Sequence, residues 1–296
     1  MKPDIHQINR REFLQRSLAV GAAAAFPAAV RSAAEPPKIR RANDIIELGP
    51  AKLKVSRMAI GSGTTGGGRS SNQLRKLGVN GVADLWWSGY DHGLFFLDTA
   101  DTYGTHDSVK VLLKKVPREK LVIMTKTEAR SAEEMKSDLE RYRQEMGVDY
   151  IDILLLHCVF APKWDELYKP QMDVLSEAKA KKTIGMLGLS CHSLDCIQIT
   201  TKCPWVDVAM VRVNPASTRM DADTDVVLPL LAQMKAAGKG LVGIKVLGEG
   251  QLVDTIDDAL RFALTKSQLD CFSIGCESQE QVLDNINRIA KAGQPA

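Results

Sequence analysis

The sequence predicts an α/β fold, a (β/α)8 TIM barrel with a short N-terminal β-hairpin. From residue 57 onward, short and nearly continuous apolar runs alternate eight times with longer amphipathic stretches. Continuous apolar runs are typical of parallel strands that are covered on both faces, and the amphipathic stretches have the period of helices. Eight strand-helix units within about 240 residues fit a closed barrel, with a doubly wound open sheet as the alternative.

The predicted elements follow the chain in order. The segments DIIEL and KLKVS, separated by Gly49 and Pro50, predict a hairpin ahead of the barrel. The predicted strands are 57–61, 95–99, 121–125, 151–157, 184–190, 206–213, 241–246 and 271–275. The predicted helices are 81–92, 106–115, 132–146, 165–181, 194–202, 225–237, 254–264 and 279–292. Ser131, followed three residues later by Glu134, is typical of a capped helix start.

The N-terminal residues 1–34 predict a signal peptide of the twin-arginine (Tat) type. Arg10 and Arg11 precede the alanine-rich apolar run LAVGAAAAFPAAV, which is short and small-residue-rich for a membrane span. An amphipathic helix or an uncleaved anchor is the alternative. Residues 35–43 are predicted as a linker and 44–296 as the barrel. We therefore expect export by the Tat machinery to the periplasm, or a cytoplasmic protein if the signal does not function, and no stable membrane span in the mature chain.

The composition is that of an ordinary globular protein, with 45% hydrophobic and 25% charged residues in a chain of 296. The formal net charge of +3 gives no electrostatic case for binding nucleic acid. The six cysteines show no CxxC motif and no spacing typical of a metal site. We interpret them as small buried hydrophobic residues rather than as disulfides or metal ligands.

Four polar residues stand at or just after the ends of predicted strands. Asp98 ends FFLD, Tyr103 follows five positions later, Lys126 ends LVIMTK and His157 ends IDILLLH. A buried charge without a partner is costly, and the carboxyl ends of neighbouring barrel strands meet at one mouth. The sequence therefore predicts that these four side chains contact one another there.

Together with the hairpin, the segments LDTADTYG, MTK, LLLH, GLS and IGCESQEQVLDNI resemble the aldo-keto reductase family, and the resemblance extends from residue 44 to the last helix. It implies an NAD(P)-dependent oxidoreductase that interconverts a carbonyl (aldehyde, ketone or sugar) and an alcohol by hydride transfer. The catalytic residues would be Asp98, Tyr103, Lys126 and His157.

The chemistry of these side chains fits carbonyl reduction. The reaction needs a proton on oxygen, and a phenol with a pKa of about 10 is a sluggish donor unless a cation stands beside it. Lys126 would lower the pKa of Tyr103, Asp98 would hold Lys126, and His157 would orient the carbonyl. The hydride must come from a nicotinamide, because no side chain supplies one.

The resemblance also implies the cofactor-binding residues Ser190, Lys245, Gly248, Gly275, Ser278, Gln281 and Asn285. Three positions depart from the usual family residues: Cys191 replaces an asparagine, Met210 a glutamine and Ile244 a tyrosine. Gln281 stands where an arginine often meets the 2′-phosphate, with the carboxylate of Glu277 nearby. Family habit favours NADP slightly, and NAD stays open.

Other sequence features bear on the substrate. Arg212 is expected near the mouth, either clamping a substrate or paired with Asp221 or Asp223. The chain ends soon after the last helix, which predicts an open, polar pocket suited to sugars and other hydroxylated carbonyl compounds. A cofactor-holding sensor with little turnover, or an isomerase or lyase that reuses the four residues, are the alternative functions.

Overall fold

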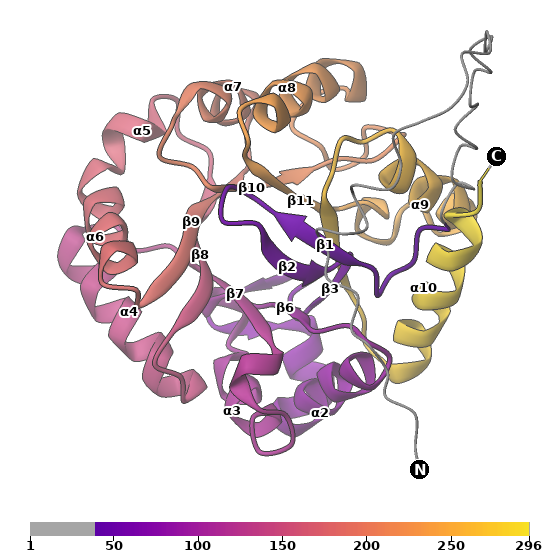
Figure 1. The fold of residues 1–296 in the computed structure, drawn as a ribbon, viewed down its shortest axis with the longest axis horizontal. Helices are drawn as coiled ribbons and strands as arrows, with labels where there is room; N and C mark the ends of the chain where they lie inside the picture. The colour runs from indigo at the N-terminus through magenta and orange to yellow at the C-terminus, as the bar shows by residue number, and fades with distance from the viewer. Residues whose placement is uncertain (1–38, 296) are drawn as a thin grey trace, which may run out of the picture. The chain divides into compact units, whose positions relative to one another are not determined.

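A closed barrel of eight parallel strands forms the centre of the structure, a computed structural model that describes residues 39–295. Around the barrel the strand order is β3, β6, β7, β8, β9, β10, β11 and β12, and β12 pairs with β3 to close it. Helices surround the strands (Figure 1). The predicted (β/α)8 barrel with its N-terminal hairpin is confirmed, and the open sheet is excluded.

The barrel strands are β3 (Met58–Gly61), β6 (Phe96–Asp98), β7 (Val122–Thr127), β8 (Ile151–Val159), β9 (Ile184–Cys191), β10 (Val208–Arg212), β11 (Gly240–Ile244) and β12 (Cys271–Gly275). The α-helices are α2 (Asn72–Asp91), α3 (His106–Leu112), α4 (Ala132–Met146), α5 (Trp164–Leu167), α6 (Lys169–Ala180), α7 (Leu194–Lys202), α8 (Thr224–Ala236), α9 (Ile256–Thr265) and α10 (Gln279–Ala292). Short 3₁₀ turns include η1 (Asp101–Tyr103), η2 (Arg118–Lys120), η3 (Gly248–Gly250) and η4 (Val253–Thr255).

A hairpin of β1 (Ile45–Leu48) and β2 (Leu53–Ser56) closes the N-terminal end of the barrel. Leu48 and Val55 are fully buried with side chains of the barrel interior, and Leu48 packs against Gly240, the first residue of β11. In Figure 1 the indigo hairpin lies across the centre of the ring of strands. Because this end is plugged, ligands must enter from the opposite mouth, where the strands end.

Two buried layers hold the barrel together. One cluster fills the barrel interior and includes Phe96, Met124 and Leu155, while a larger one lies between the strands and the helices and includes Trp86 and Trp164. Each strand therefore buries both faces, which explains why the strands read as continuous apolar runs.

Two helices differ most from the sequence-based prediction, and α3 ends three residues earlier than predicted. α2 begins nine residues before position 81, because Ser71 accepts a hydrogen bond from the amide of Leu74 and caps it, and Gly78 (φ 67°) interrupts its regular geometry. The predicted helix 165–181 is split at Tyr168 into α5 and α6, and Pro170 stands in the first turn of α6. The helices α4, α7 and α10 have the predicted bounds.

Residues just before the hairpin lie against the barrel. The amide of Arg40 donates to the carbonyl of Gly293, and the amide of Met58 donates to the carbonyl of Ala42. The predicted signal peptide, residues 1–34, lies outside the described residues. Among residues 39–295, no helix combines the length and apolar character that crossing a bilayer requires.

Candidate active site

The C-terminal mouth of the barrel contains a cleft of about 750 Å³. Asp98, Lys126 and His157 enter it from the neighbouring strands β6, β7 and β8, and Tyr103 enters from the turn η1. The parallel register sets Asp98 beside Met124 and Lys126 beside Leu155, so the polar ends of the three strands reach the same rim. The structure brings the four residues together, as the sequence predicts.

Lys126 and Asp98 form a buried ion pair at the floor of the cleft. The Lys126 ammonium donates to Oδ1 of Asp98 at 2.5 Å and to the carbonyl of Thr99 at 2.8 Å, and Ser273 donates to Oδ2 of Asp98 at 2.6 Å. Burial lowers the pKa of Lys126, but the Asp98 carboxylate and Tyr103 together outweigh burial, so this pKa lies above its usual value. Lys126 is therefore a permanent cation in the site.

Tyr103 lies directly above this cation. The ammonium of Lys126 is 4.7 Å from the centroid of the phenol ring. Burial raises the pKa of Tyr103 above its usual value, and Lys126 opposes this only in part. The sequence predicts the lowering effect of Lys126 but not the larger opposing effect of burial. The result is a neutral phenol, the protonated form that a general acid needs.

His157 completes the group. Its ring lies edge-on to that of Tyr103, with centroids 5.5 Å apart. Burial, the Lys126 cation and then His192 lower the pKa of His157 well below its usual value, so the imidazole is neutral. Its Nδ1 lies 3.2 Å from Oγ1 of Thr102; when Thr102 donates to Nδ1, the ring proton is on Nε2 and can be donated to a ligand oxygen.

The profile of the Aldo/keto reductase family matches residues 57–294. The chain belongs to this family. It is 25% identical over 208 residues to the NADH-specific methylglyoxal reductase of Escherichia coli, and the aligned segment covers 62% of each protein. It is 23% identical over 218 residues to the L-galactose dehydrogenase of Arabidopsis thaliana, covering 70% of this chain and 66% of that protein. The match thus spans slightly less than two thirds of the length of these curated relatives.

Solved structures of aldo-keto reductases have a similar fold. A protein of Pseudomonas aeruginosa assigned to this family superposes with a TM-score of 0.70 at 22% identity, covering 86% of this chain and 98% of that chain. An aldo-keto reductase of Klebsiella pneumoniae in complex with NADPH gives a TM-score of 0.64 at 17% identity, covering 85% and 89%. At these identities the likeness shows the fold.

Five of the seven cofactor residues that the aldo-keto reductase resemblance implies line the cleft: Ser190, Lys245, Gly275, Gln281 and Asn285. Gly248 and Ser278 lie outside its lining. Gly248 (φ 60°) shapes the turn after β11, and the hydroxyl of Ser278 caps α10 by accepting from the amide of Gln281. Ser278 therefore has the role of a helix cap in the structure.

Four of these five side chains already bond to other protein groups, among them Ser190 and Lys245. The hydroxyl of Ser190 accepts from the amide of Cys158 at 2.8 Å. The ammonium of Lys245 donates to the carbonyl of Thr64 at 3.0 Å and lies 3.1 Å from Glu249. Lys245 therefore joins the loop after β11 to the loop after β3.

The positions that depart from the family pattern differ in their access to the cleft. Met210 and Ile244 line it and supply an apolar wall. Cys191 is buried, with its thiol 3.6 Å from the hydroxyl of Thr200, on the helix side of β9. Cys191 therefore offers the cleft no polar group in place of the carboxamide of the asparagine that the family has at this position.

Arg212 binds Asp221 through two hydrogen bonds and donates to the carbonyl of His192 at 3.1 Å. It is absent from the described residues that line the cleft. Of the two sequence interpretations, the structure supports the ion pair, because Asp221 occupies the guanidinium edge that a substrate would need.

The sequence did not point to several cleft residues that come from loops after the strands. They include Thr64, Glu128 and Leu247. Their position directly after predicted strands was the available signal, but loop sequence alone does not say which side chains turn inward.

Two groups of described residues contain donor types that could hold a metal ion. Asp101, His106 and Glu145 lie together, but Arg69 and Arg141 already bind these carboxylates. The two guanidinium groups thus take the place that a metal ion would need. The second group, Glu128, His157 and Cys158, borders the cleft.

Proposed function

We propose that this aldo-keto reductase interconverts a small carbonyl compound and an alcohol with a nicotinamide dinucleotide. One observation carries the proposal: a neutral phenol, a buried ammonium with its carboxylate, and a neutral imidazole share one cleft. The same cleft extends past the apolar Met210 and Ile244 to the amides of Gln281 and Asn285. An apolar wall suits a nicotinamide ring and polar groups suit an adenosine, so the residues present fit the cofactor, which supplies the hydride when bound.

In this mechanism, Tyr103 transfers its phenolic proton to the carbonyl oxygen. The ammonium of Lys126 stabilises the phenolate that results, and Asp98 keeps Lys126 oriented toward the ring. His157 donates a hydrogen bond from Nε2 to the same oxygen and so fixes the direction from which the substrate enters. In alcohol oxidation each proton moves in the opposite direction.

For the substrate, we propose small, hydroxylated or otherwise polar aldehydes and ketones. Charged and polar side chains such as Glu128 and Lys245 line the cleft, and the names of the curated relatives refer to methylglyoxal and L-galactose. A screen that shows strong preference for bulky apolar ketones over such compounds would rule this out.

For the cofactor, NADP and NAD both fit the cleft. The carboxylates of Glu277 and Asp284 line the end where the family resemblance places the adenosine. Glu277 is held there by Asn72 at 2.6 Å and by Lys76 at 2.8 Å. A carboxylate accepts from ribose hydroxyls but repels a 2′-phosphate, which supports use of NADH by this chain.

The decisive experiment is fluorescence titration of the full chain with NADH and NADPH, followed by assays of carbonyl-dependent cofactor oxidation. Tyr103→Phe should retain cofactor binding and lose about 10²- to 10⁴-fold in turnover. Cofactor binding with no turnover would favour the sensor function. If neither cofactor binds, both of these functions fail and the isomerase or lyase alternative gains.

We also propose that the chain is exported to the periplasm by the Tat machinery. The twin Arg10-Arg11 ahead of an alanine-rich apolar run supports this. Cell fractionation should find the shortened chain in the periplasm, and replacing both arginines by lysine should keep it in the cytoplasm. Equal distribution of the two forms would contradict the proposal.

A further inference from the structure

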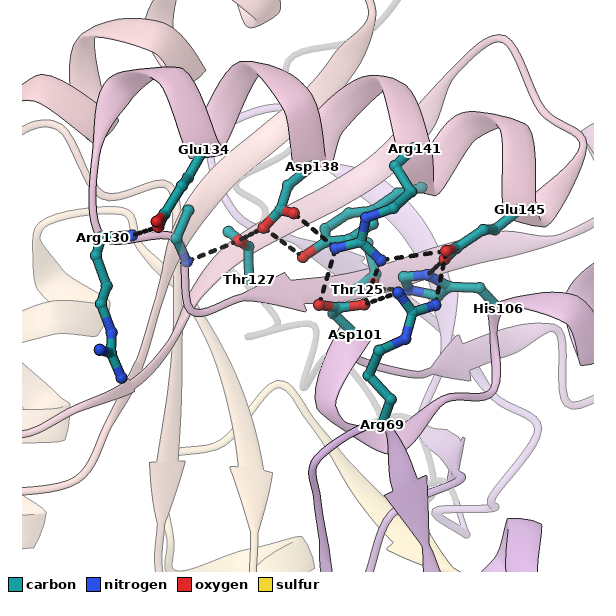
Figure 2. A network of polar contacts seen from close by, with 12 residues as sticks. Arg69, Asp101, His106, Thr125, Thr127, Arg130, Glu134, Asp138, Arg141 and Glu145 are labelled. Carbon is teal, nitrogen blue, oxygen red and sulfur yellow. Dashed lines mark hydrogen bonds and ion pairs between the residues drawn. The ribbon is translucent and has the colours of Figure 1, made fainter.

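One face of helix α4 bonds to the chain on both sides of the catalytic turn. Asp138, Arg141 and Glu145 follow one another at helical spacing and point toward η1 and the end of β7 (Figure 2). Helix α4 carries its own cap at Ser131 and buries Tyr142 completely, so it is a fixed element against which loops can be held.

Before Tyr103, the contact is made by Asp101, the first residue of η1. Arg141 binds both carboxylate oxygens of Asp101, at 2.7 and 3.0 Å. The same guanidinium donates to Asp138 at 2.6 Å and to Glu145 at 3.1 Å. A bidentate pair fixes direction as well as distance, so the start of the turn has a defined orientation relative to α4.

After Tyr103, the contact is made by His106, the first residue of α3. Its Nδ1 lies 2.8 Å from Oε2 of Glu145, and its Nε2 lies 2.7 Å from Oγ1 of Thr125. The ring is buried. The turn is therefore bonded to α4 both two residues before and three residues after the phenol.

The same helix face also bonds to both neighbours of Lys126. Thr125 is bound through His106, and Thr127 donates directly to Oδ2 of Asp138 at 2.7 Å. Because these threonines flank the catalytic lysine in β7, α4 holds Lys126 and Tyr103 in a fixed position relative to each other. Of the described residues that line the cleft, none is Asp101, His106, Arg141 or Glu145, so the network acts from outside it.

We propose that Arg141 and Glu145 are positioning residues, which fix the separation and orientation of the Tyr103 phenol and the Lys126 ammonium. This inference rests on the proposed function. Tyr103 lies on a three-residue turn, and the few hydrogen bonds of so short a turn fix the orientation of the phenol only weakly. Proton transfer requires that orientation to be well defined. The ion network supplies that definition without contacting substrate or cofactor.

The test compares Arg141→Gln and Asp101→Asn with the wild-type full chain. In each variant we expect kcat for carbonyl reduction to fall about 10- to 100-fold, because a small misplacement of reacting groups has effects of this size. KM for the carbonyl and Kd for NADH should stay within about twofold, because the network does not touch either ligand. Both changes remove the contact between Arg141 and Asp101, so the double variant should lose little more than Arg141→Gln alone.

Arg143→Gln is the matched control. Arg143 lies on the same helix but binds Glu140 at 2.8 Å and the carbonyl of Asp149 at 3.0 Å, away from η1. We expect wild-type kcat from it. Arg141→Lys, which keeps the charge without the bidentate geometry, should have a kcat between those of Arg141→Gln and wild type.

Wild-type kcat in both Arg141→Gln and Asp101→Asn would overturn the inference. So would a loss of kcat that disappears once the variants are assayed well below their melting temperatures. If Arg141→Gln does not fold, Asp101→Asn decides, since it leaves Arg141 bonded to Asp138 and Glu145. An inert wild-type chain would instead be a failure of the proposed function.

Discussion

Among individual residues, Lys126 contacts two other members of the candidate site. It is almost completely buried, it neutralises Asp98, and it lies over the ring of Tyr103. The same charge therefore serves stability and catalysis, because removing it leaves one buried carboxylate unpaired and one phenol without its cation.

We predict that Lys126→Met destabilises the protein by about 3–5 kcal/mol, the usual effect of leaving one partner of a buried ion pair uncompensated. Chemical denaturation measures this. The double variant Asp98→Asn/Lys126→Met should recover part of the stability but none of the activity. A Lys126→Met variant that unfolds at the wild-type denaturant concentration would show that the pair is not buried in solution.

A second residue-scale prediction concerns pH. Burial first, and Lys126 next, keep the pKa of His157 far below 6.5, while burial keeps the pKa of Tyr103 above 10. Both groups therefore hold one protonation state through neutral pH, and kcat/KM for reduction should be flat from about pH 5 to about pH 9. An inflection near pH 6.5 that is lost in His157→Gln would contradict this.

Among the elements, the loop after β3 has the closest contact with the catalytic turn. This glycine-rich segment pairs β4 (Gly66–Gly67) with β5 (Ser70–Ser71) and packs onto Tyr103. A Cβ on Gly63 would lie 2.4 Å from the phenol ring, whereas a Cβ on Gly67 would meet nothing within 4 Å. The loop thus packs behind the phenol ring of Tyr103. This role is more specific than that of a flexible loop at the rim, which its glycine-rich composition indicates.

We predict that Gly63→Ala displaces the ring of Tyr103 and lowers kcat by about 10- to 100-fold, since a shift of this kind misplaces the proton donor. Gly67→Ala, in the same loop, is the control and should keep wild-type kcat. Equal activities of the two variants would mean that the ring moves aside without consequence.

At the scale of the whole molecule, one end of the barrel is plugged and the other carries the chemistry. The hairpin fills the N-terminal end with apolar side chains, and the ion network of α4 ties the opposite end to the outer helices. Loss of that network should therefore affect global unfolding as well as catalysis.

Acid unfolding tests this. Burial raises the pKa of Glu145, but hydrogen bonds from His106, Arg69 and Arg141 outweigh it and lower the pKa to about 2, from 4.5 without these contacts. A lowered folded-state pKa contributes stability above pH 4.5, which is lost as the pH falls toward 2. Glu145→Gln should be less stable than wild type at neutral pH, with the difference vanishing near pH 2. The exposed Glu119→Gln should show no such trend.

Sequence reasoning reached the architecture and the grouping of Asp98, Tyr103, Lys126 and His157 at the barrel mouth because both depend on local patterns. Continuous apolar runs identify buried parallel strands, and a charged residue that ends such a run must find partners at the barrel mouth. The same reasoning missed the cap at Ser71, since it placed the helix start nine residues too late.

Contacts between distant segments were decided only by the tertiary structure. From the sequence, Arg212 could bind either a substrate or an acidic residue. Only the fold shows that Asp221 lies at its guanidinium group. Likewise, Asp101 and Arg141 are 40 positions apart in the sequence, and nothing in the intervening residues indicates that the two side chains bind. The sequence alone determined the order of strands and helices and the apolar runs that must be buried. Folding decided where each strand ends and which side chains meet, because pairing energy depends on distances that no linear spacing encodes.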